Sequence, residues 1–507
     1  MFCSITSTAI SGVDALPVYV EADVSEGMPV FNIIGSLSQR TKEAADRVKT
    51  AMRNLGIVLP PKRITINLSP GDVKKDGTRY DLPIAAAVLS ALGRIPEDRL
   101  KDTLIMGELH LDGRIEGVPG ILPSILLANK LGISTALVPA ENAAEAEAAG
   151  IVKVTALSCL KDLIDYCTSG MVPEQPPLRK ANAQEQPALK EDFSDIRGQA
   201  VVKRACLIAA AGFHNLLLSG PPGSGKSMAA RRLPGILPEM TAEEKLEVSR
   251  IYSVAGLLTS EQPVITERPF RAPHHLLSPQ ALVGGGRTPV PGEITLAHRG
   301  VLFLDELPEM PGRNLEFLRQ PLEDRFIRIS RIGRSVVFPC DFLLAAAMNP
   351  CPCGYYPDLN RCTCTERDIH NYNSRISQPI LDRIDLRVDV PALEYRSLQS
   401  EGKDEISTAV LRAKVAAAFE IQKDRYRDLA FSFNSGLPAN EIKNHCMLTD
   451  EAARLLEAAY HSLSLSARGY HRVLRIARTI ADLEGAETIN EAHISEAVFF
   501  RQHAGKA

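Results

Sequence analysis

The chain has 507 residues, of which 45% are hydrophobic and 23% carry a charge. This is the composition of an ordinary globular protein, and the length predicts about three domains. The formal net charge of -3 excludes a protein that is basic throughout, although it allows a local basic surface. No stretch reaches the roughly 18 apolar residues of a membrane span, and no secretory signal is visible. We therefore expect a cytoplasmic protein without a membrane partner.

Residues 1–170 are predicted to form an α+β unit. Alternating or continuous apolar residues predict strands over residues 16–24, 30–34, 64–68 and 134–139, the last closing the unit. Helical spacing of apolar residues predicts a helix between residues 42 and 55, and a second helix is expected to begin with Asp81 as its cap.

Residues 171–192 contain four prolines among polar and charged residues and no aromatic residue, which is typical of an extended linker. The linker is followed by a predicted ATPase core of the α/β class over residues 193–394. Residues 395–507 are predicted to be a helical C-terminal lid domain. In this last unit a helix is expected over residues 449–463, and Asn490 is expected to cap the final helix.

The central motif is a phosphate-binding loop of the form G-x-x-x-x-G-K-[ST]. It consists of Gly220, Pro221, Pro222, Gly223, Ser224, Gly225, Lys226 and Ser227. The loop lies between a predicted buried strand and a predicted helix, so that backbone N–H groups and the helix dipole face the phosphates. We expect Lys226 to reach the β- and γ-phosphates of ATP, and Ser227 to ligate Mg²⁺.

Polar residues at the ends of two later strands predict hydrolysis. Asp305 and Glu306 follow a buried apolar strand about 80 residues after the phosphate loop. Asp305 is expected to hold the Mg²⁺ shell, and Glu306 to orient and deprotonate the attacking water. Asn349 follows an apolar strand over residues 342–348 and suits a sensor of the γ-phosphate; the alternative is a turn-forming Asn before Pro350.

Two arginine positions predict a nucleotide site shared between subunits. Ring-forming ATPases commonly supply an arginine to the γ-phosphate of the neighbouring subunit, and Arg383 is predicted to be that finger. The alternative is a salt bridge to a neighbouring aspartate. In the lid we expect one arginine to lean over the nucleotide, with Arg468 as first choice and Arg472 or Arg475 as alternatives; simple solvated cations are the other interpretation.

Four cysteines lie within 14 residues, at Cys351, Cys353, Cys362 and Cys364. Four soft thiolate ligands at short spacing suit a structural, tetrahedral Zn²⁺ ion. The alternatives are free thiols or a redox-labile loop. A catalytic metal is not expected, because four cysteine ligands leave no open coordination position.

The order of elements in the N-terminal unit resembles the proteolytic domain of Lon-type proteases, especially at residues 75–77 and 113–121. A Lon-type site needs a serine and a lysine at the positions that are here Arg79 and Leu122. Neither side chain can act as nucleophile or general base. The resemblance therefore implies the Lon-like fold without the peptidase activity.

The whole chain resembles the YifB/ComM-type family of Mg-chelatase-like AAA+ ATPases. Its distinctive stretches are residues 268–275, 292–298 and 347–354. The resemblance implies a multidomain α/β protein that forms a hexameric ring, hydrolyses ATP and acts on branched or single-stranded DNA, as in branch migration and unwinding during natural transformation. The alternatives are a protein-remodelling ATPase of the Mg-chelatase kind and a Lon-like protease.

Two basic segments suit contacts with DNA phosphates in such a ring. The first is an insertion before the Asp305 strand that in this family projects into the pore, with Arg268, Arg271, His274 and His275. The second is a predicted hairpin before the Asn349 strand, with Arg325, Arg328, Arg331 and Arg334. Four arginines in ten residues make a local positive surface suited to phosphate contacts without base reading. Salt bridges between subunits are the alternative.

Overall fold

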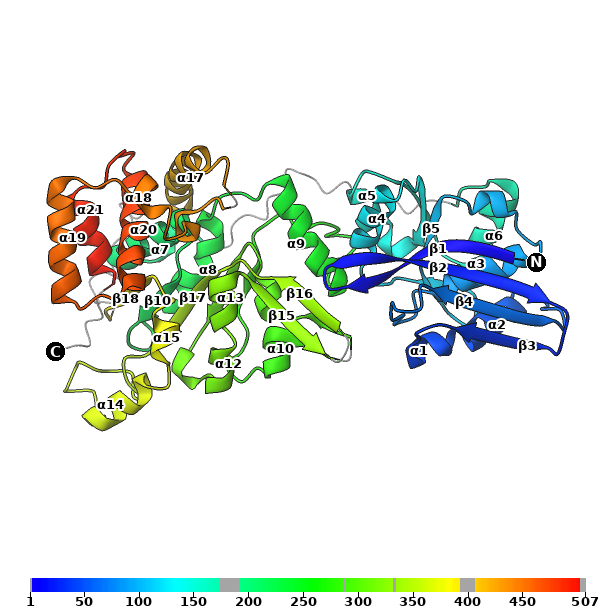
Figure 1. Cartoon of the computed structure of the whole chain (residues 1–507). Coiled ribbons are helices and arrows are strands. Elements are labelled where there is room, and N and C mark those ends of the chain that lie inside the picture. Colours follow the sequence, from blue (N-terminus) through cyan, green and yellow to red (C-terminus); the bar gives the residue numbers. More distant parts are fainter. Residues whose placement is uncertain are drawn as a thin grey trace.

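The computed structural model describes residues 2–173, 191–286, 288–331, 334–392, 406–429 and 431–501. Most of the linker predicted for residues 171–192 falls outside these ranges. The chain is an elongated molecule in which an N-terminal α+β part, a central α/β part and a C-terminal group of helices follow one another (Figure 1). Among the described residues, no helix is both long enough and apolar enough to cross a membrane.

The N-terminal part is built on a seven-stranded mixed sheet in the order β3-β4-β2-β1-β5-β8-β9. Its strands are β1 (Phe2–Ser11), β2 (Asp14–Ser25), β3 (Val30–Ile34), β4 (Arg63–Ser69), β5 (Thr103–Ile105), β8 (Thr135–Pro139) and β9 (Lys153–Leu157). Its main helices are α2 (Ala44–Asn54), α3 (Asp81–Ala91), α4 (Ile121–Lys130), α5 (Ala143–Ala148) and α6 (Leu160–Ser169). Helix α3 is buried along its whole length because it packs between the β1–β2 pair and α2.

The strands and helices predicted for this part are confirmed, with two corrections. The unit does not close at β8, since β9 and α6 follow it. Asp81 is not a helix cap: Tyr80 occupies that position, and the Asp81 carboxylate accepts hydrogen bonds from Arg47 at 2.6 and 2.9 Å. A buried carboxylate paired with arginine looks, in the sequence, like a capping residue at the start of a helix.

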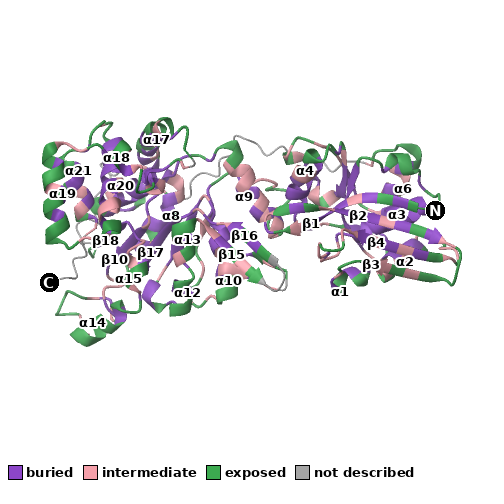
Figure 2. Ribbon diagram, in the orientation of Figure 1, coloured by how far each residue is buried: buried purple, intermediate pink, exposed green. Residues whose placement is uncertain are grey.

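The central part contains a five-stranded parallel sheet in the order β11-β14-β17-β10-β18. The strands are β11 (Phe270–Arg271), β14 (Val301–Leu304), β17 (Leu343–Met348), β10 (Leu216–Ser219) and β18 (Leu386–Asp389). The longer helices are α7 (Ala200–Gly212), α8 (Lys226–Ile236), α9 (Ala242–Val254) and α14 (Glu366–Asn373). Every residue of β10, β14 and β17 is buried, as expected for parallel strands covered on both faces (Figure 2).

Short elements fill the connections of the central sheet. They are α10 (Pro279–Val283), β12 (Gly284–Gly285), β13 (Val290–Pro291), α11 (Glu293–Leu296), α12 (Gly312–Glu316), α13 (Arg319–Asp324) and α15 (Gln378–Leu381). The hairpin predicted before the Asn349 strand is present as β15 (Phe326–Arg331) and β16 (Arg334–Pro339). It points toward the N-terminal part, where a Cβ built on Gly12 would lie 3.0 Å from Val336 (Figure 1).

The C-terminal part consists of α17 (Thr408–Arg425), α18 (Ile442–His445), α19 (Asp450–Ser462), α20 (Ala467–Leu483) and α21 (Glu491–Phe499). The predicted helix over residues 449–463 and the cap at Asn490 are confirmed, because the Asn490 side chain accepts the His493 N–H. Helices α17 and α20 pack on α7 and share one apolar core with the central sheet. The C-terminal helices therefore pack directly on the central part of the chain.

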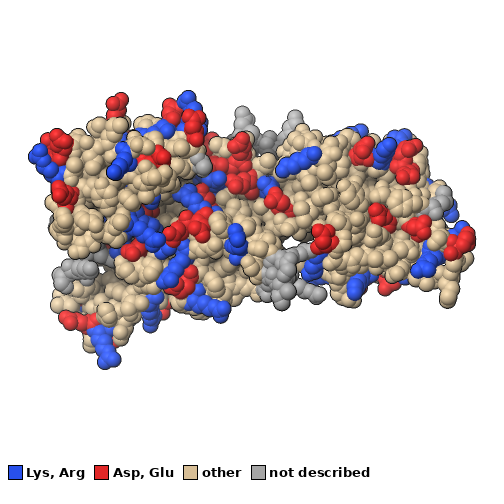
Figure 3. Space-filling model, in the orientation of Figure 1, with Lys and Arg blue, Asp and Glu red and all other residues tan. Residues whose placement is uncertain are grey.

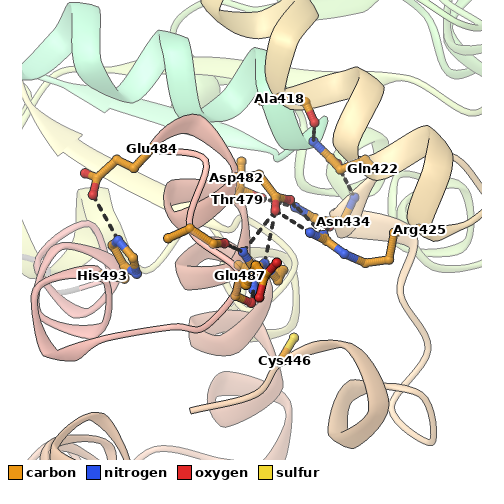
Figure 4. Close-up of polar contacts among 12 residues, drawn as sticks. Ala418, Gln422, Arg425, Asn434, Cys446, Thr479, Asp482, Glu484, Glu487 and His493 are labelled. Carbon is orange, nitrogen blue, oxygen red and sulfur yellow. Dashed lines mark hydrogen bonds and ion pairs between the residues drawn. The ribbon is translucent and has the colours of Figure 1, made fainter. Parts of the chain in front are cut away.

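A buried polar network joins the lid helices (Figure 4). The Asp482 carboxylate accepts hydrogen bonds from Arg425 at 2.5 and 2.9 Å, from Arg478 at 3.1 Å and from the Asn434 amide at 2.8 Å. Gln422 extends the network to the core by donating to the Ala211 carbonyl of α7 at 2.9 Å. Paired charges of this kind are stable in a core only when every partner is present.

Candidate functional site

The phosphate-binding loop lies between β10 and α8, as the sequence predicts. Gly223 and Gly225 have φ angles of 74° and 91°, which side chains other than glycine rarely adopt. The Lys226 ammonium donates to the carbonyls of Gly220 at 2.6 Å and Pro221 at 2.9 Å. Burial lowers the pKa of Lys226, while nearby Asp305 opposes this change.

The predicted hydrolytic residues lie on the same edge of the sheet. Since the strands are parallel, the loop after β10 and the residues after β14 and β17 come together at their carboxyl ends. Ser227 Oγ donates to Asp305 at 2.7 Å, so that the two expected Mg²⁺ ligands are adjacent. Asn349 Oδ1 accepts from Lys226 at 3.2 Å, which fits a sensor beside the γ-phosphate position.

Glu306 follows Asp305 in the left-handed region, with a φ of 50°. Its backbone N–H donates to Asp305 at 2.9 Å, and its half-exposed carboxylate lies 3.2 Å from His275 Nδ1. The unusual backbone turns the two carboxylates in different directions, one toward Ser227 and one toward solvent. This division suits one acid that binds the metal and one that handles water.

The loop that follows Asn349 holds the four predicted cysteine ligands. The Cys351 sulfur lies 3.4 Å from that of Cys353 and 3.7 Å from that of Cys362, and Cys353 and Cys362 are 3.5 Å apart. All four sulfurs, including that of Cys364, lie within 4.8 Å of one another. The structure thus brings together the complete set that the sequence singles out, and such a set can hold a metal ion.

The predicted finger Arg383 and the lid residue Arg468 meet at a different place. Both bind the Glu323 carboxylate of α13, Arg468 at 3.1 Å. They line a cavity of about 380 Å³ between α13, α20 and the segment that precedes β18. Its basic residues are Arg325, Arg383, Arg468, Arg472 and Arg475. On the face drawn in Figure 3, Lys and Arg side chains gather in this region with acidic side chains among them.

The aspartates that the sequence offers as salt-bridge partners have other roles. Asp385 binds Arg472 at 2.9 Å and accepts the Asn215 N–H at 3.0 Å. Burial opposes its ionisation, but Arg472, His214 and this N–H lower the pKa of its carboxyl well below the usual range. The Nε atoms of Arg383 and Arg475 are buried and have no hydrogen-bond partner among the described residues. Such unpaired donors favour an anionic ligand in the cavity.

This cavity lies on the edge of the sheet opposite to the phosphate loop. Arg383 comes just before β18, and its carbonyl accepts from Asn215, which comes just before β10. The phosphate loop begins at the far end of β10, about 13 Å away for a four-residue strand. Arg468 therefore lies at the opposite end of β10 from a nucleotide bound to its own chain, and its predicted contact with a nucleotide stays a prediction.

The residues predicted to contact DNA in the insertion are used differently. Arg268 is buried and donates to the carbonyls of Pro238 at 2.5 Å and Arg299 at 2.7 Å, so its predicted DNA contact is wrong for this conformation. Arg271 forms a double hydrogen bond with Glu293 at 2.6 and 2.7 Å. Internal pairing satisfies both guanidinium groups, and this cannot be seen from charge alone.

The remaining basic residues divide between the active site and the surface. His274 is exposed and packs on His275, which binds Glu306. In the hairpin, Arg328 is exposed, whereas Arg325 binds Asp341 at 3.0 Å. The side chains of the two residues at the hairpin tip, Arg331 and Arg334, lie outside the described part of the structure, and their predicted DNA contacts stay predictions.

Arg79 and Leu122, at the positions that correspond to a Lon-type serine and lysine, lie near each other and make contacts within the protein. Arg79 is buried and donates to Thr8 Oγ1 at 3.1 Å and to the Pro119 carbonyl, next to the start of α4. The Leu122 N–H in α4 is bound by Glu145 at 2.9 Å and by Ser253 of α9 at 3.3 Å. These two positions therefore hold no pair of nucleophile and base. Ser253, which belongs to the ATPase part, contacts the Leu122 N–H there.

Two residues beside the nucleotide site, and one in the cavity with Arg383, make contacts that were not predicted. Gln199 donates to the Pro391 carbonyl at 2.9 Å and to the Ser224 carbonyl of the phosphate loop at 3.4 Å. His275 binds Glu306, and Glu323 bridges two arginines. The left-handed φ of 51° at Gln199 is a tertiary feature. The sequence gives no signal for it beyond a Gly-Gln pair at the start of α7.

Comparison with known proteins agrees with this arrangement. Residues 192–398 match the family described as magnesium chelatase, subunit ChlI, residues 20–142 match subunit ChlI of Mg-chelatase, and residues 405–501 match the ChlI C-terminal family. A segment of 144 residues, 27% of this chain, is 31% identical to Lon protease of Mycolicibacterium smegmatis, covering 18% of that protein. The similarity supports the Lon-like fold of the N-terminal part.

Three curated relatives match nearly the whole chain. Competence protein ComM of Haemophilus influenzae is 43% identical over 98% of this chain and 96% of its own length. The proteins YifB of Salmonella typhimurium and Escherichia coli are 42% and 41% identical, over 97% and 99% of this chain and 96% and 97% of their own lengths. With its phosphate loop, paired acids and Lon-like N-terminal part, the chain belongs to the ComM and YifB family of Mg-chelatase-like AAA+ ATPases.

Proposed function

We propose that this protein is a cytoplasmic, ATP-driven motor that forms a hexameric ring and acts on branched or single-stranded DNA. One observation carries the ring: the cavity with Arg383 and Arg468 lies on the sheet edge opposite to the phosphate loop. A head-to-tail neighbour would bring its phosphate loop to this cavity, and repeated head-to-tail contacts close into rings. The guanidinium groups of Arg383 and Arg468, which line the cavity, would then donate to the neighbour's γ-phosphate.

We propose a role in hydrolysis for each residue at the carboxyl edge of the sheet. Lys226 binds the β- and γ-phosphates, and Ser227 with Asp305 would hold Mg²⁺, which neutralises phosphate charge when bound. Glu306 would orient water and accept its proton, because Asp305 binds Ser227 whereas the Glu306 carboxylate lies apart from it, beside His275. Asn349 orients the γ-phosphate or the water from the end of β17. We further propose a structural Zn²⁺ ion for the four-cysteine set.

Two observations support the proposed action on DNA: the similarity to a competence protein and the arginines of the hairpin. Arg328 of β15 is exposed, and Arg331 pairs in register with Arg334 at the tip, so three arginines share one end of a hairpin. Contacts of this kind bind phosphates without reading bases. Relatives of Mg-chelatase type use a similar core, so remodelling of a partner protein is the competing outcome.

The proposal is tested by measuring the ATPase rate with forked, four-way, duplex and single-stranded DNA. We expect branched or single-stranded DNA to raise the rate of the wild type. Glu306→Gln should bind ATP and assemble, but lose turnover by about 10²–10⁴-fold. An intact ring whose ATPase no DNA stimulates would refute the DNA motor and favour protein remodelling. Casein degradation that persists after removal of contaminating proteases would point instead to a protease.

A further inference from the structure

The loop between β17 and α14 has almost no apolar core of its own. From residue 351 to residue 365, only Cys351 and Gly354 are buried, and Leu359 is 80% exposed. Short irregular segments of this kind keep one conformation only when a crosslink or a metal holds them. The described structure nevertheless gathers the sulfurs of Cys353, Cys362 and Cys364 around that of Cys351.

The spacing of the sulfurs matches a tetrahedral metal site. Zn–S bonds of about 2.3 Å at tetrahedral angles place neighbouring sulfurs about 3.8 Å apart. The sulfur atoms of Cys351, Cys353 and Cys362 form three pairs, with Sγ–Sγ distances of 3.4, 3.5 and 3.7 Å. Cys351 is buried, and the other three are partly exposed, so that an ion has a route into the site.

The same loop touches the nucleotide site at two points. Asn349, two residues before Cys351, accepts from Lys226 at 3.2 Å. Gly354, one residue after Cys353, lies against the phosphate loop: a Cβ on Gly354 would be 2.6 Å from Pro222 Cδ. Gly354 has a φ of 87°, so that this approach requires glycine.

We propose that the four cysteines bind one Zn²⁺ ion that holds the loop against the phosphate loop, so that zinc occupancy controls the affinity of the site for ATP. This inference rests on the proposed ATPase and adds the means by which its nucleotide site is kept in place. With zinc bound, Asn349 is held because it precedes Cys351 by two residues. Pro222 is held because Gly354, which follows Cys353, packs against it. Without zinc, the loop lacks the apolar contacts to stay there, and the phosphate loop and sensor lose a shared support.

The first experiment measures zinc and nucleotide binding on the same full-length protein. Zinc is quantified in protein purified without added metal, and a fluorescent, slowly hydrolysed ATP analogue is titrated before and after chelation. We expect one zinc ion per chain and an affinity that falls about tenfold on zinc removal and returns when Zn²⁺ is added. Metal-free protein with four rapidly reacting thiols, or analogue affinity that zinc removal leaves unchanged, overturns the proposal.

Variants separate the metal site from its contact with the nucleotide site. Cys362→Ser combined with Cys364→Ser should lose zinc and bind the analogue weakly. Gly354→Ala keeps all four thiols and should retain zinc, yet bind the analogue weakly because its methyl group meets Pro222. Cys159→Ser is the matched control, since Cys159 is a partly buried free thiol at the start of α6. Analogue binding by Gly354→Ala at the wild-type level contradicts the coupling even if the double variant does not fold.

The outcomes also separate this inference from the proposed motor. Zinc-dependent nucleotide binding without stimulation by any DNA would refute the DNA motor and leave the zinc control intact. DNA-stimulated hydrolysis by a protein that never contains zinc would do the reverse.

Discussion

The carboxylate of Glu323 shows how single side chains define the arginine cavity. It binds Arg383 from the segment before β18 and Arg468 from α20, two positions 85 residues apart in the sequence. In the isolated subunit this carboxylate occupies the place where an anion would meet both guanidinium groups. A phosphate bound to a neighbouring subunit would replace Glu323 as the partner of both guanidinium groups. Because this contact needs both the neighbour and its nucleotide, assembly and nucleotide binding are expected to favour each other.

Mixing two inactive variants tests whether Arg383 acts on a neighbour. Arg383→Ala retains its phosphate loop, and Lys226→Ala retains its arginine, and each alone should lose ATPase activity about a thousandfold or more. In an equal mixture, roughly a quarter of the head-to-tail interfaces combine an intact loop with an intact arginine, and activity should return in that proportion.

The control in this experiment is Arg427→Ala, which changes an exposed arginine of the lid paired with Asp424. Its rate should equal that of the wild type. A mixture as inactive as its components, although mixed rings form, would place Arg383 outside the neighbour's site.

At the scale of elements, the polar network fixes the position of the lid and with it the arginine cavity. Asp482 of α20 binds Arg425 of α17. Almost three turns closer to the start of α20, Arg472 binds Asp385, which directly precedes β18. His214 links the two regions, since its ring contacts Thr479 at 2.8 Å and lies 3.7 Å from Asp385. The orientation of α20 therefore follows from buried charges as well as from its apolar face.

Replacing Asp482 should loosen the lid strongly. Asp482→Ala leaves Arg425 and Arg478 without their buried partner and should destabilise the lid by about 3–5 kcal/mol. Hydrogen exchange along α20 measures this effect locally, and the amides of that helix should exchange faster in the variant.

Asp424→Ala serves as the comparison, because Asp424 forms an exposed pair with Arg427. It should change stability by less than about 1 kcal/mol. Equal protection of α20 in both variants would mean that the apolar core alone holds the lid.

At the scale of the whole molecule, helix α9 joins the ATPase part to the Lon-like part. It follows α8, which begins at the phosphate loop, and Figure 1 shows it between the two parts. Its Ser253 donates to buried Glu145 at 2.5 Å, and its carbonyl accepts the Gly120 N–H at 2.9 Å. Burial raises the pKa of Glu145, although hydrogen bonds from Ser253 and Leu122 oppose the change. The residues around the position of a Lon-type protease site thus contact the ATPase part and join the two parts.

Glu145→Ala tests the strength of this joint. The change leaves the Ser253 hydroxyl and the Leu122 N–H without their shared acceptor and should weaken the joint by about 1–3 kcal/mol. Small-angle scattering should show a broader distribution of distances between the two parts. Glu147→Ala, on the same short helix α5, is the control and should leave the scattering unchanged; an identical profile for Glu145→Ala would show that other contacts hold the parts together.

The hairpin tip carries the prediction for DNA. Arg331→Ala with Arg334→Ala removes two charges, so the dependence of DNA affinity on salt should fall by about 1.8 in its logarithmic slope for duplex DNA. Affinity should fall with it, as measured by fluorescence anisotropy over a range of salt concentrations. Lys414→Ala in the lid helix α17 provides a charge control; unchanged DNA affinity in the double variant would refute the contact.

The sequence by itself determined the nucleotide chemistry, because the phosphate loop, Asp305, Glu306 and Asn349 are each coded by a few adjacent residues at a strand end. It also determined the cysteine set and the order of the elements, since both depend on local spacing. Only the tertiary structure decided how the arginines are paired and where they lie. Arg268 and Arg271 are paired internally, whereas Arg383 and Arg468 meet across 85 residues on the edge away from the phosphate loop. Burial and pairing of a charge depend on what the fold brings to it, and no local pattern records that.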